Sequence, residues 1–243
     1  MIDREQATSI AASWAAPRGG VEVEIGLREF DQGWVAWPKP AQVGLGAARV
    51  VIDKETGELS QWPSIPVSTI IAQYPDRLAA QLRFPPMALR SLHRAGWKSG
   101  RRVPGAVDAW MAAHTDDLRL VPFSATARQV LEEFGGLTLD QLDESGTPLP
   151  GHRSLLFPHP ACGPLTRAYL GFTEETGIPL FPVGTHGEGP SEVAVAPDGR
   201  TFLFHPTGEY HLGDTFDEAL ITLTTDRPAL PLDPEGSVDL HRR

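Results

Sequence analysis

One pair of residues has the spacing of a known catalytic site. His186 and Glu188 form the H-x-E half of a zinc deaminase signature, in which the histidine binds zinc and the glutamate moves protons. The signature also needs a P-C-x-x-C run downstream. The chain has none, and its single cysteine, Cys162, lies upstream. The glycines around His186 indicate a turn instead, so the sequence does not predict a deaminase.

A second group could supply a nucleophile with a base. Cys162 stands close in sequence to His152 and His159, and a thiol activated by a histidine is a common nucleophile. The segment is interrupted by residues that break regular structure, namely Pro158, Pro160, Gly163 and Pro164. A lone cysteine is more often a small buried hydrophobe. A hydrolase that uses Cys162 is therefore the least favoured hypothesis.

Two other kinds of ligand site also lack support. No glycine-rich phosphate loop follows a predicted strand. The acids Asp140, Asp143 and Glu144 do not have the spacing of a calcium loop, and a solvated loop explains them better. The sequence thus predicts no catalytic residues, no cofactor and no metal, and a protein that is not an enzyme.

The composition is that of a folded globular protein. Of its 243 residues, 41% are hydrophobic and 21% are charged, which are ordinary values for a globular chain. A single cysteine excludes an internal disulfide and fits a reducing compartment. No run approaches the roughly 20 apolar residues that cross a bilayer. The first ten residues lack the apolar core of a secretory signal. We expect a cytoplasmic protein without a membrane partner.

The net charge of −10 is unevenly distributed. Residues 81–122 carry 7 basic and 3 acidic side chains, whereas residues 123–243 carry 7 basic and 18 acidic ones. An acidic field repels phosphate backbones and steers cationic partners. We therefore expect no nucleic-acid binding. We expect a protein partner instead, contacted through acids on two exposed loops: Asp140, Asp143 and Glu144, and Glu188 and Glu192.

The first 80 residues have the periodicities of a small α+β domain. Arg4–Trp14 has the spacing of an amphipathic helix. Alternating apolar residues predict strands at Val21–Leu27, Gly33–Trp37, Arg49–Asp53 and Glu58–Trp62. A short helix then begins at Pro66 and ends at Pro75. A joint over residues 76–81, able to extend the helix, leads to a domain boundary near residue 80.

Residues 81–228 predict a second α+β domain, and residues 229–243 a flexible tail. The expected helices cover residues 84–95, 104–114, 124–134, 165–177 and 215–223. The expected strands cover residues 137–139, 155–157, 179–183, 193–196, 201–204 and 209–212. Residues 140–151 are expected to form an acidic loop. Each domain is thus a mainly antiparallel sheet packed with helices.

The tryptophans are candidates for partner contacts, because exposed tryptophan is a preferred interface anchor. Most of the six lie on apolar faces or beside turns and are expected in the core. In the strand at Gly33–Trp37, Trp34 and Trp37 point to opposite faces. One of these two has the better chance of exposure, so both are included among the candidate partner-binding residues.

Several short motifs of the second half occur in a characteristic order. Ala95-Gly-Trp97 with Gly100-Arg101 precedes Phe134-Gly-Gly-Leu137 and Pro179-Leu-Phe-Pro-Val-Gly184. Asp198-Gly-Arg200 and a run from Leu212 to Leu220 follow. In this order the motifs resemble the SUKH superfamily of bacterial immunity proteins, third subgroup. The resemblance covers residues 82–225 and implies a SUKH-like fold.

The first half contains a second set of motifs. Gly33-Trp-Val-Ala-Trp37 is followed by the hairpin Val50-Val-Ile-Asp-Lys-Glu-Thr-Gly57 and a helix that reaches Tyr74-Pro75. This combination resembles the YrhB-type immunity domain. Ala36 stands where that family more often has an aromatic residue, and a proline-containing insert follows.

The two resemblances together imply an immunity protein, or antitoxin. Such a protein would bind and neutralise a cognate polymorphic toxin without catalysis. The acidic balance favours a basic toxin that acts on nucleic acid. The alternative is a non-catalytic regulatory scaffold that binds a cellular enzyme. A neighbouring gene for a large secreted protein with a toxin C-terminus would favour immunity over the scaffold.

Overall fold

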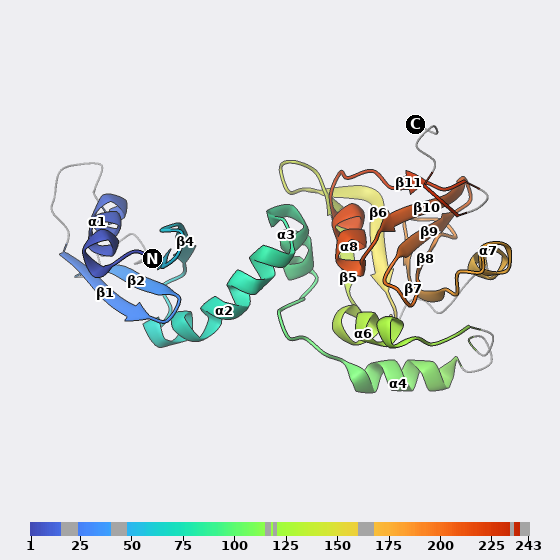
Figure 1. The fold of residues 1–243 in the computed structure, drawn as a ribbon, viewed down its shortest axis with the longest axis horizontal. Coiled ribbons are helices and arrows are strands. Elements are labelled where there is room, and N and C mark those ends of the chain that lie inside the picture. Colours follow the sequence, from blue (N-terminus) through green and yellow to red (C-terminus); the bar gives the residue numbers. More distant parts are fainter. Residues whose placement is uncertain are drawn as a thin grey trace. The chain divides into compact units, whose positions relative to one another are not determined.

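The computed structural model describes residues 1–15, 24–39, 48–114, 118, 121–159, 168–233 and 236–238. They belong to two compact units, Met1–Leu78 and Ala79–Arg243 (Figure 1). Each unit contains one antiparallel sheet packed with helices. The predicted α+β class with two small domains is therefore confirmed. Cys162, the expected start of a strand at Val21 and the end of the expected tail lie outside the described residues.

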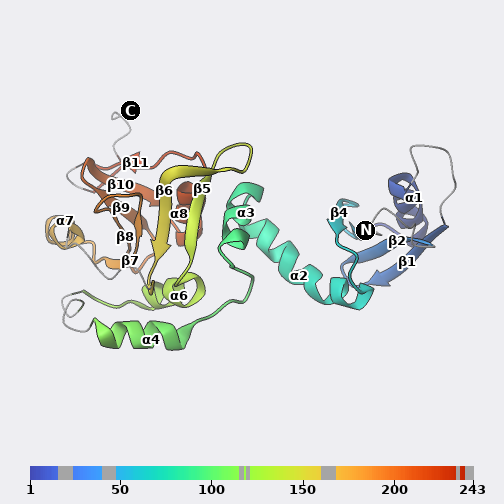
Figure 2. The same cartoon turned by 180° about the vertical axis from the view of Figure 1, so that it is seen from behind.

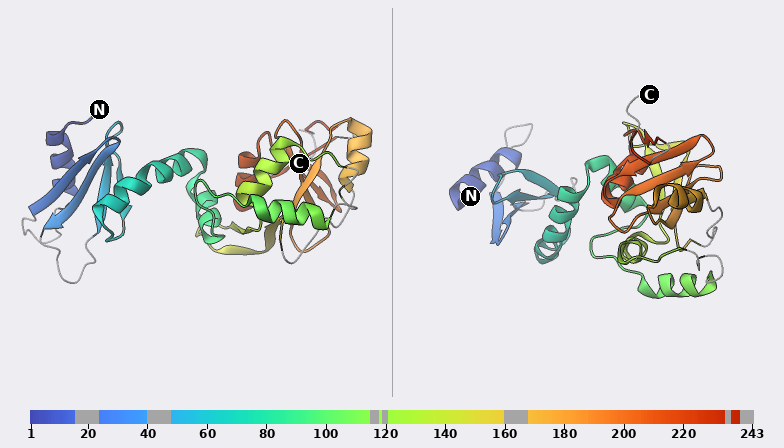
Figure 3. Two further views of the ribbon diagram at one scale, coloured as in Figure 1. Left: turned by 90° about the horizontal axis from the view of Figure 1, so that it is seen from below. Right: turned by 45° about the vertical axis from the view of Figure 1, so that its right-hand side comes forward.

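The described part of the first unit is a four-stranded sheet with a helix on each face (Figure 3, left). The strands run in the order β1-β2-β3-β4. Their bounds are β1 Glu24–Phe30, β2 Gly33–Lys39, β3 Arg49–Asp53 and β4 Leu59–Trp62. Helix α1 (Arg4–Ala15) covers one face, and the first turns of α2 (Val67–Arg83) cover the other.

Strand β2 contributes to a separate core on each face of this sheet. Trp34 and Ala36 lie in the core under α1, whereas Val35 and Trp37 contact the core under α2. This is the alternation that the sequence predicted, since successive side chains of a strand point to opposite faces. Because both faces carry a helix, β2 is apolar on both sides.

The helix that was expected to end at Pro75 continues to Arg83, so that expectation is wrong. Contacts on both sides of the proline hold the helix to the sheet. Before it, the Tyr74 hydroxyl donates a hydrogen bond to Asp53 Oδ2 at 2.9 Å. After it, the Arg77 guanidinium lies 4.5 Å from the centre of the Trp62 ring. Strong helix formers follow at residues 78–81, and tertiary contacts can override one lost backbone hydrogen bond.

The second unit is built on a seven-stranded sheet in which all neighbouring strands are antiparallel. The order is β11-β10-β9-β8-β7-β6-β5. The strand bounds are β5 Thr138–Leu142, β6 Pro148–Leu156, β7 Phe181–His186, β8 Glu192–Val195, β9 Thr201–His205, β10 Gly208–Gly213 and β11 Leu230–Pro231. Consecutive strands are neighbours throughout, so the sheet is a simple meander.

Five named helices accompany this sheet in the described residues. They are α3 Pro86–Arg94, α4 Pro104–Ala113, α6 Ala125–Phe134, α7 Ala168–Thr176 and α8 Phe216–Thr224. Helices α3 and α8 contact β5 on one face of the sheet. Helices α4 and α6 lie side by side (Figure 3, left). A single apolar core joins these helices to the sheet.

The acidic loop that was expected at residues 140–151 is mostly a hairpin. Strand β5 extends to Leu142, a turn follows, and β6 begins at Pro148. The prolines and Gly151 in this segment suggested a loop. They are tolerated because β6 begins to pair with β7 only at Ser154, so its first residues lie on an unpaired edge. Asp140 therefore lies in a strand, opposite Arg153.

Part of the segment expected to be a flexible tail is ordered. Leu230 and Pro231 pair with β10 as strand β11. The Leu232 amide donates to the Glu209 carbonyl at 3.0 Å, and its side chain is buried. A bridge also joins Leu232 to Val238. In the sequence Ala-Leu-Pro-Leu, Leu232 provides the burial that the composition of the tail concealed, whereas Leu230 is 38% exposed.

We predict that the two units fold independently, because each encloses its own core. Overlapping fragments, residues 1–83 and 79–243, each retain the part of α2 that their core uses. Each should melt cooperatively by circular dichroism and near-ultraviolet signal. If the intact chain melts cooperatively and neither fragment does, the division into two folding units is wrong.

Candidate partner-binding site

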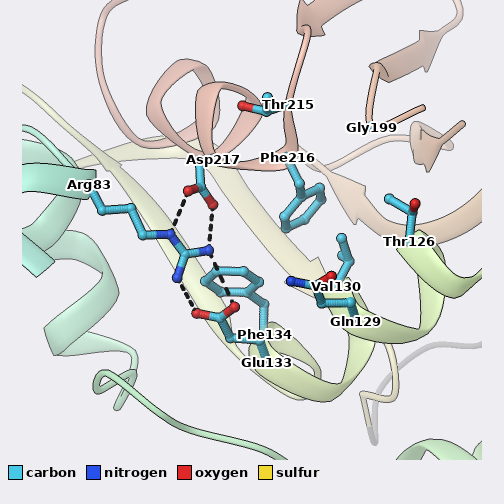
Figure 4. A pocket seen from close by; sticks show the side chains of 10 residues that line it. All are labelled: Arg83, Thr126, Gln129, Val130, Glu133, Phe134, Gly199, Thr215, Phe216 and Asp217. Carbon is cyan, nitrogen blue, oxygen red and sulfur yellow. Dashed lines mark hydrogen bonds and ion pairs between the residues drawn. The ribbon is translucent and has the colours of Figure 1, made fainter. Parts of the chain in front are cut away.

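The motifs of the second half meet at the Glu133 carboxylate, near the end of α6. Arg83 donates from Nη1 to Glu133 Oε1 at 2.5 Å and from Nη2 to Asp217 Oδ1 at 2.6 Å (Figure 4). The indole of Trp97 donates to the same Glu133 oxygen at 3.2 Å. The end of α2, the turn after α3 and the start of α8 are thus joined to α6.

The basic turn after α3 closes the end of α6. The Arg101 guanidinium donates to the carbonyls of Glu133 and Gly135 at 2.6 and 2.8 Å, two groups that the helix itself leaves without partners. The Trp97 ring stacks on Phe134, with 6.2 Å between ring centres. Gly136 has a φ of 79°, which favours glycine at the helix end.

The remaining motif residues fix the start of α8. The Thr215 hydroxyl accepts a hydrogen bond from the Glu218 amide at 3.2 Å, and the Glu218 carboxylate accepts from the Asp214 amide at 2.8 Å. This reciprocal pattern is similar to a capping box, which stabilises a helix start. The motifs that carry the family resemblance therefore support the fold.

A pocket of about 220 Å³ lies among these motifs (Figure 4). Its lining residues are Arg83, Thr126, Gln129, Val130, Glu133, Phe134, Gly199, Thr215, Phe216 and Asp217. The charged groups that line it hydrogen-bond to one another, and Thr126 donates to the Pro197 carbonyl at 2.6 Å. Paired in this way, they serve to join α2, α6 and α8.

A larger groove lies elsewhere, along β5, β6 and the turn between β7 and β8. It encloses about 420 Å³. Its lining residues are Asp140, Pro148, Leu149, Pro150, Gly151, Arg153, Leu155, Gly187 and Glu188. Figure 2 shows the face of β5 and β6 that is turned away from α8, with none of the drawn helices in front of it.

The groove brings two of the sequence-predicted residues together. Asp140 comes from β5 and Glu188 from the turn after β7, and both line the groove. Arg153 of β6 stands opposite Asp140, and its Nε donates to Asp140 Oδ1 at 2.8 Å. Leu155 supplies an apolar part of the lining. Arg153 and Leu155 were not among the residues predicted from the sequence; they alternate with buried Ser154 and Leu156 along β6.

Asp143 and Glu144 lie in the turn between β5 and β6, away from the groove lining. The Ser145 hydroxyl and the Thr147 amide hydrogen-bond to the Asp143 carboxylate and lower its pKa. Asp143 thus stabilises the turn. Arg94 of α3 donates to the Gly146 carbonyl at 3.1 Å, so part of the basic segment lies beside this acidic turn. Glu144 is exposed.

Two other predicted partner contacts are not at the surface. Glu192 is 1% exposed and Trp34 is 3% exposed, so the expectation of an exposed Glu192 is wrong. Trp37 is half-buried, and its ring occupies the space above Gly26, where a Cβ would lie 2.2 Å from the indole. Of the two tryptophans in β2, Trp37 is the more exposed one.

The histidine that suggested zinc chemistry lies at the end of strand β7. His186 Nδ1 is 2.9 Å from the Ser154 hydroxyl. Burial, together with nearby His152 and His205, lowers the pKa of His186 to about 4, so the ring is neutral near pH 7. Within the described residues, no three acidic, histidine or cysteine side chains are grouped to hold a metal ion.

Comparison with known families identifies the class of protein. Both halves match immunity proteins: the family described as Immunity protein 35-like domain matches residues 5–81. The family described as SUKH-3 immunity protein matches residues 84–226. The chain belongs to the SUKH-3 immunity protein family and has a second, N-terminal immunity domain, so the expected two-domain immunity protein is confirmed.

Searches of curated proteins and of solved structures found no match to the chain. In the described part of the chain, none of the helices combines the length and apolar character that a membrane span requires.

We predict that Glu133→Ala destabilises the second unit by about 1.5–3 kcal/mol, because Arg83 and Trp97 both lose an acceptor on a charged group. Urea unfolding measures this loss. Glu175→Ala, an exposed position on α7, is the control and should change stability by less than about 0.5 kcal/mol. Equal urea midpoints of unfolding for the two variants would contradict the role assigned to Glu133.

Proposed function

We propose that this protein neutralises a cognate polymorphic toxin by binding it in the cytoplasm, and that it acts without catalysis. The two immunity-family matches, which together span most of the chain, support this function. The polar clusters described above are bonded within the fold. The carboxylates at Arg83 hold helices together, and His186 is a half-buried neutral ring at the end of β7.

The observation from which we infer the partner-binding surface is the groove on the open face of β5 and β6. The family motifs are occupied in holding helix ends, whereas the groove residues Asp140, Arg153 and Glu188 lie outside those motifs. A surface that must suit one particular toxin is best placed where the fold does not depend on its side chains. The groove is such a place, and it is accessible.

The charge of the chain indicates the kind of toxin. A toxin that acts on nucleic acid needs a basic surface to approach phosphates. An acidic immunity protein attracts that surface and competes with the nucleic acid for it. Residues 123–243, which contain the groove, carry 18 acidic and 7 basic side chains. The same charge disfavours nucleic acid as a direct partner of this protein.

Affinity capture from the native host, followed by mass spectrometry, tests the function. We expect the tagged protein to retain a secreted protein with a toxin domain at its C-terminus. Co-expression of that domain with the immunity protein should restore growth. Capture of a cellular enzyme alone, with no protection against any neighbouring toxin, would support the regulatory scaffold instead.

We predict that removing both groove carboxylates, with Asp140→Asn and Glu188→Gln together, slows association with the captured toxin. Rim charges act mainly on the association rate, and each contributes about 0.2–1 kcal/mol, so the pair should slow it several-fold. Raising salt from about 50 to 500 mM should have the same effect on the unmodified protein.

The matched control replaces Glu174 and Glu175 by glutamine on α7, which removes the same charge from exposed positions away from the groove. Surface plasmon resonance separates the two rate constants. If both double variants slow association equally, only the total charge matters and the groove is not the contact surface.

A further inference from the structure

Arg153 places a positive charge inside an otherwise acidic groove. Its Nε donates to Asp140 Oδ1 at 2.8 Å, and both residues line the groove with Glu188. The arginine side chain is 62% exposed and the aspartate 24%. The carboxylate is therefore the more enclosed partner, and the guanidinium covers it from the solvent side.

The groove has the shape and chemistry of a site for a long basic side chain. Prolines at positions 148 and 150 and the leucines at 149 and 155 provide apolar surface against which an aliphatic stem can lie. Asp140 and Glu188 provide carboxylates for the charged end. The groove encloses about 420 Å³ of empty space beside the Arg153 side chain.

The existing ion pair is weak enough to exchange. Exposed pairs of this kind contribute only about 0.2–1 kcal/mol. An arginine brought in by a partner would make the same hydrogen bonds to Asp140. It would do so as the surrounding water is expelled, where a charge-assisted bond is stronger. The internal arginine would then turn into solvent at little cost.

We propose that an arginine of the toxin displaces Arg153 from Asp140 when the complex forms. In the free protein, Arg153 takes the place of that arginine. This inference rests on the proposed function and adds the chemistry of the contact. Arg153 keeps the carboxylate paired in the free protein, and it favours partners whose own arginine fits the groove. Its removal should therefore improve binding of an arginine, which is the opposite of what loss of a direct contact would do.

The test uses the full chain and a defined probe, the peptide acetyl-Gly-Arg-Gly-amide, with the uncharged citrulline peptide as its counterpart. Binding is followed by NMR through the backbone amide signals of Gly151 and Gly187, which line the groove. Arg153→Gln should lower the dissociation constant for the arginine peptide about two- to fivefold. The citrulline peptide should not respond to the substitution.

Arg200→Gln is the matched control. Arg200 also donates from Nε to an aspartate, Asp198 Oδ2, at 2.8 Å, and its pair is exposed. It lies on the turn between β8 and β9, which is at the other end of β8 from Glu188. The substitution removes the same positive charge. If affinity for the arginine peptide rises only because the protein becomes more acidic, it should therefore rise equally in both variants.

A double variant shows whether the higher affinity for the arginine peptide requires Asp140. In the background of Asp140→Asn, Arg153→Gln should give no improvement. Equal affinities for the Arg153 and Arg200 variants, or weaker binding by Arg153→Gln, would overturn the proposal. Arg153→Ala provides a second test of the same position. These outcomes are independent of toxin protection, so the inference can fail while the immunity function stands.

Discussion

The second unit depends on a carboxylate that must remain paired. Glu133 is largely buried, and it accepts hydrogen bonds from Arg83 and Trp97. A buried carboxylate without donors is costly, so the end of α2 and the turn after α3 are both held close to α6. Asp217 shares the same guanidinium and brings the start of α8 to this point. The apolar face of α8, with Ala219 and Leu220 fully buried, packs into the core of the same unit.

This arrangement separates the residues that define the family from those that can define the partner. Trp97, Arg101 and Gly136 are needed where the backbone ends a helix, and each bonds or packs within the fold. Asp140 and Arg153 bond only to each other through their side chains in the described contacts, and they lie on an exposed strand pair. A substitution at either of these two positions alters the surface and leaves the contacts that hold the helices together intact. Such a division suits a protein that has to recognise one toxin among related ones.

The sequence predicted the features that depend on local pattern. The alternation along Gly33–Trp37 correctly placed Trp34 and Trp37 on opposite faces of the first sheet. The same kind of reasoning failed where distant contacts decide the outcome. Pro75 does not end α2, because Tyr74 and Arg77 hold both sides of it to the sheet. The shared groove of Asp140 and Glu188 depends on the register of β5, β6 and β7, which a single sequence does not specify.

Strand β11 gives the large sheet a blunt edge. The Leu232 amide points inward to β10, so by alternation the missing N–H of Pro231 belongs to the outward side. Strand β11 is only two residues long, and Leu232, which follows it, already pairs with Val238. Unprotected edges invite other chains to add to a sheet. A short edge strand whose next residue is already paired offers little backbone to which a second copy of the chain could add.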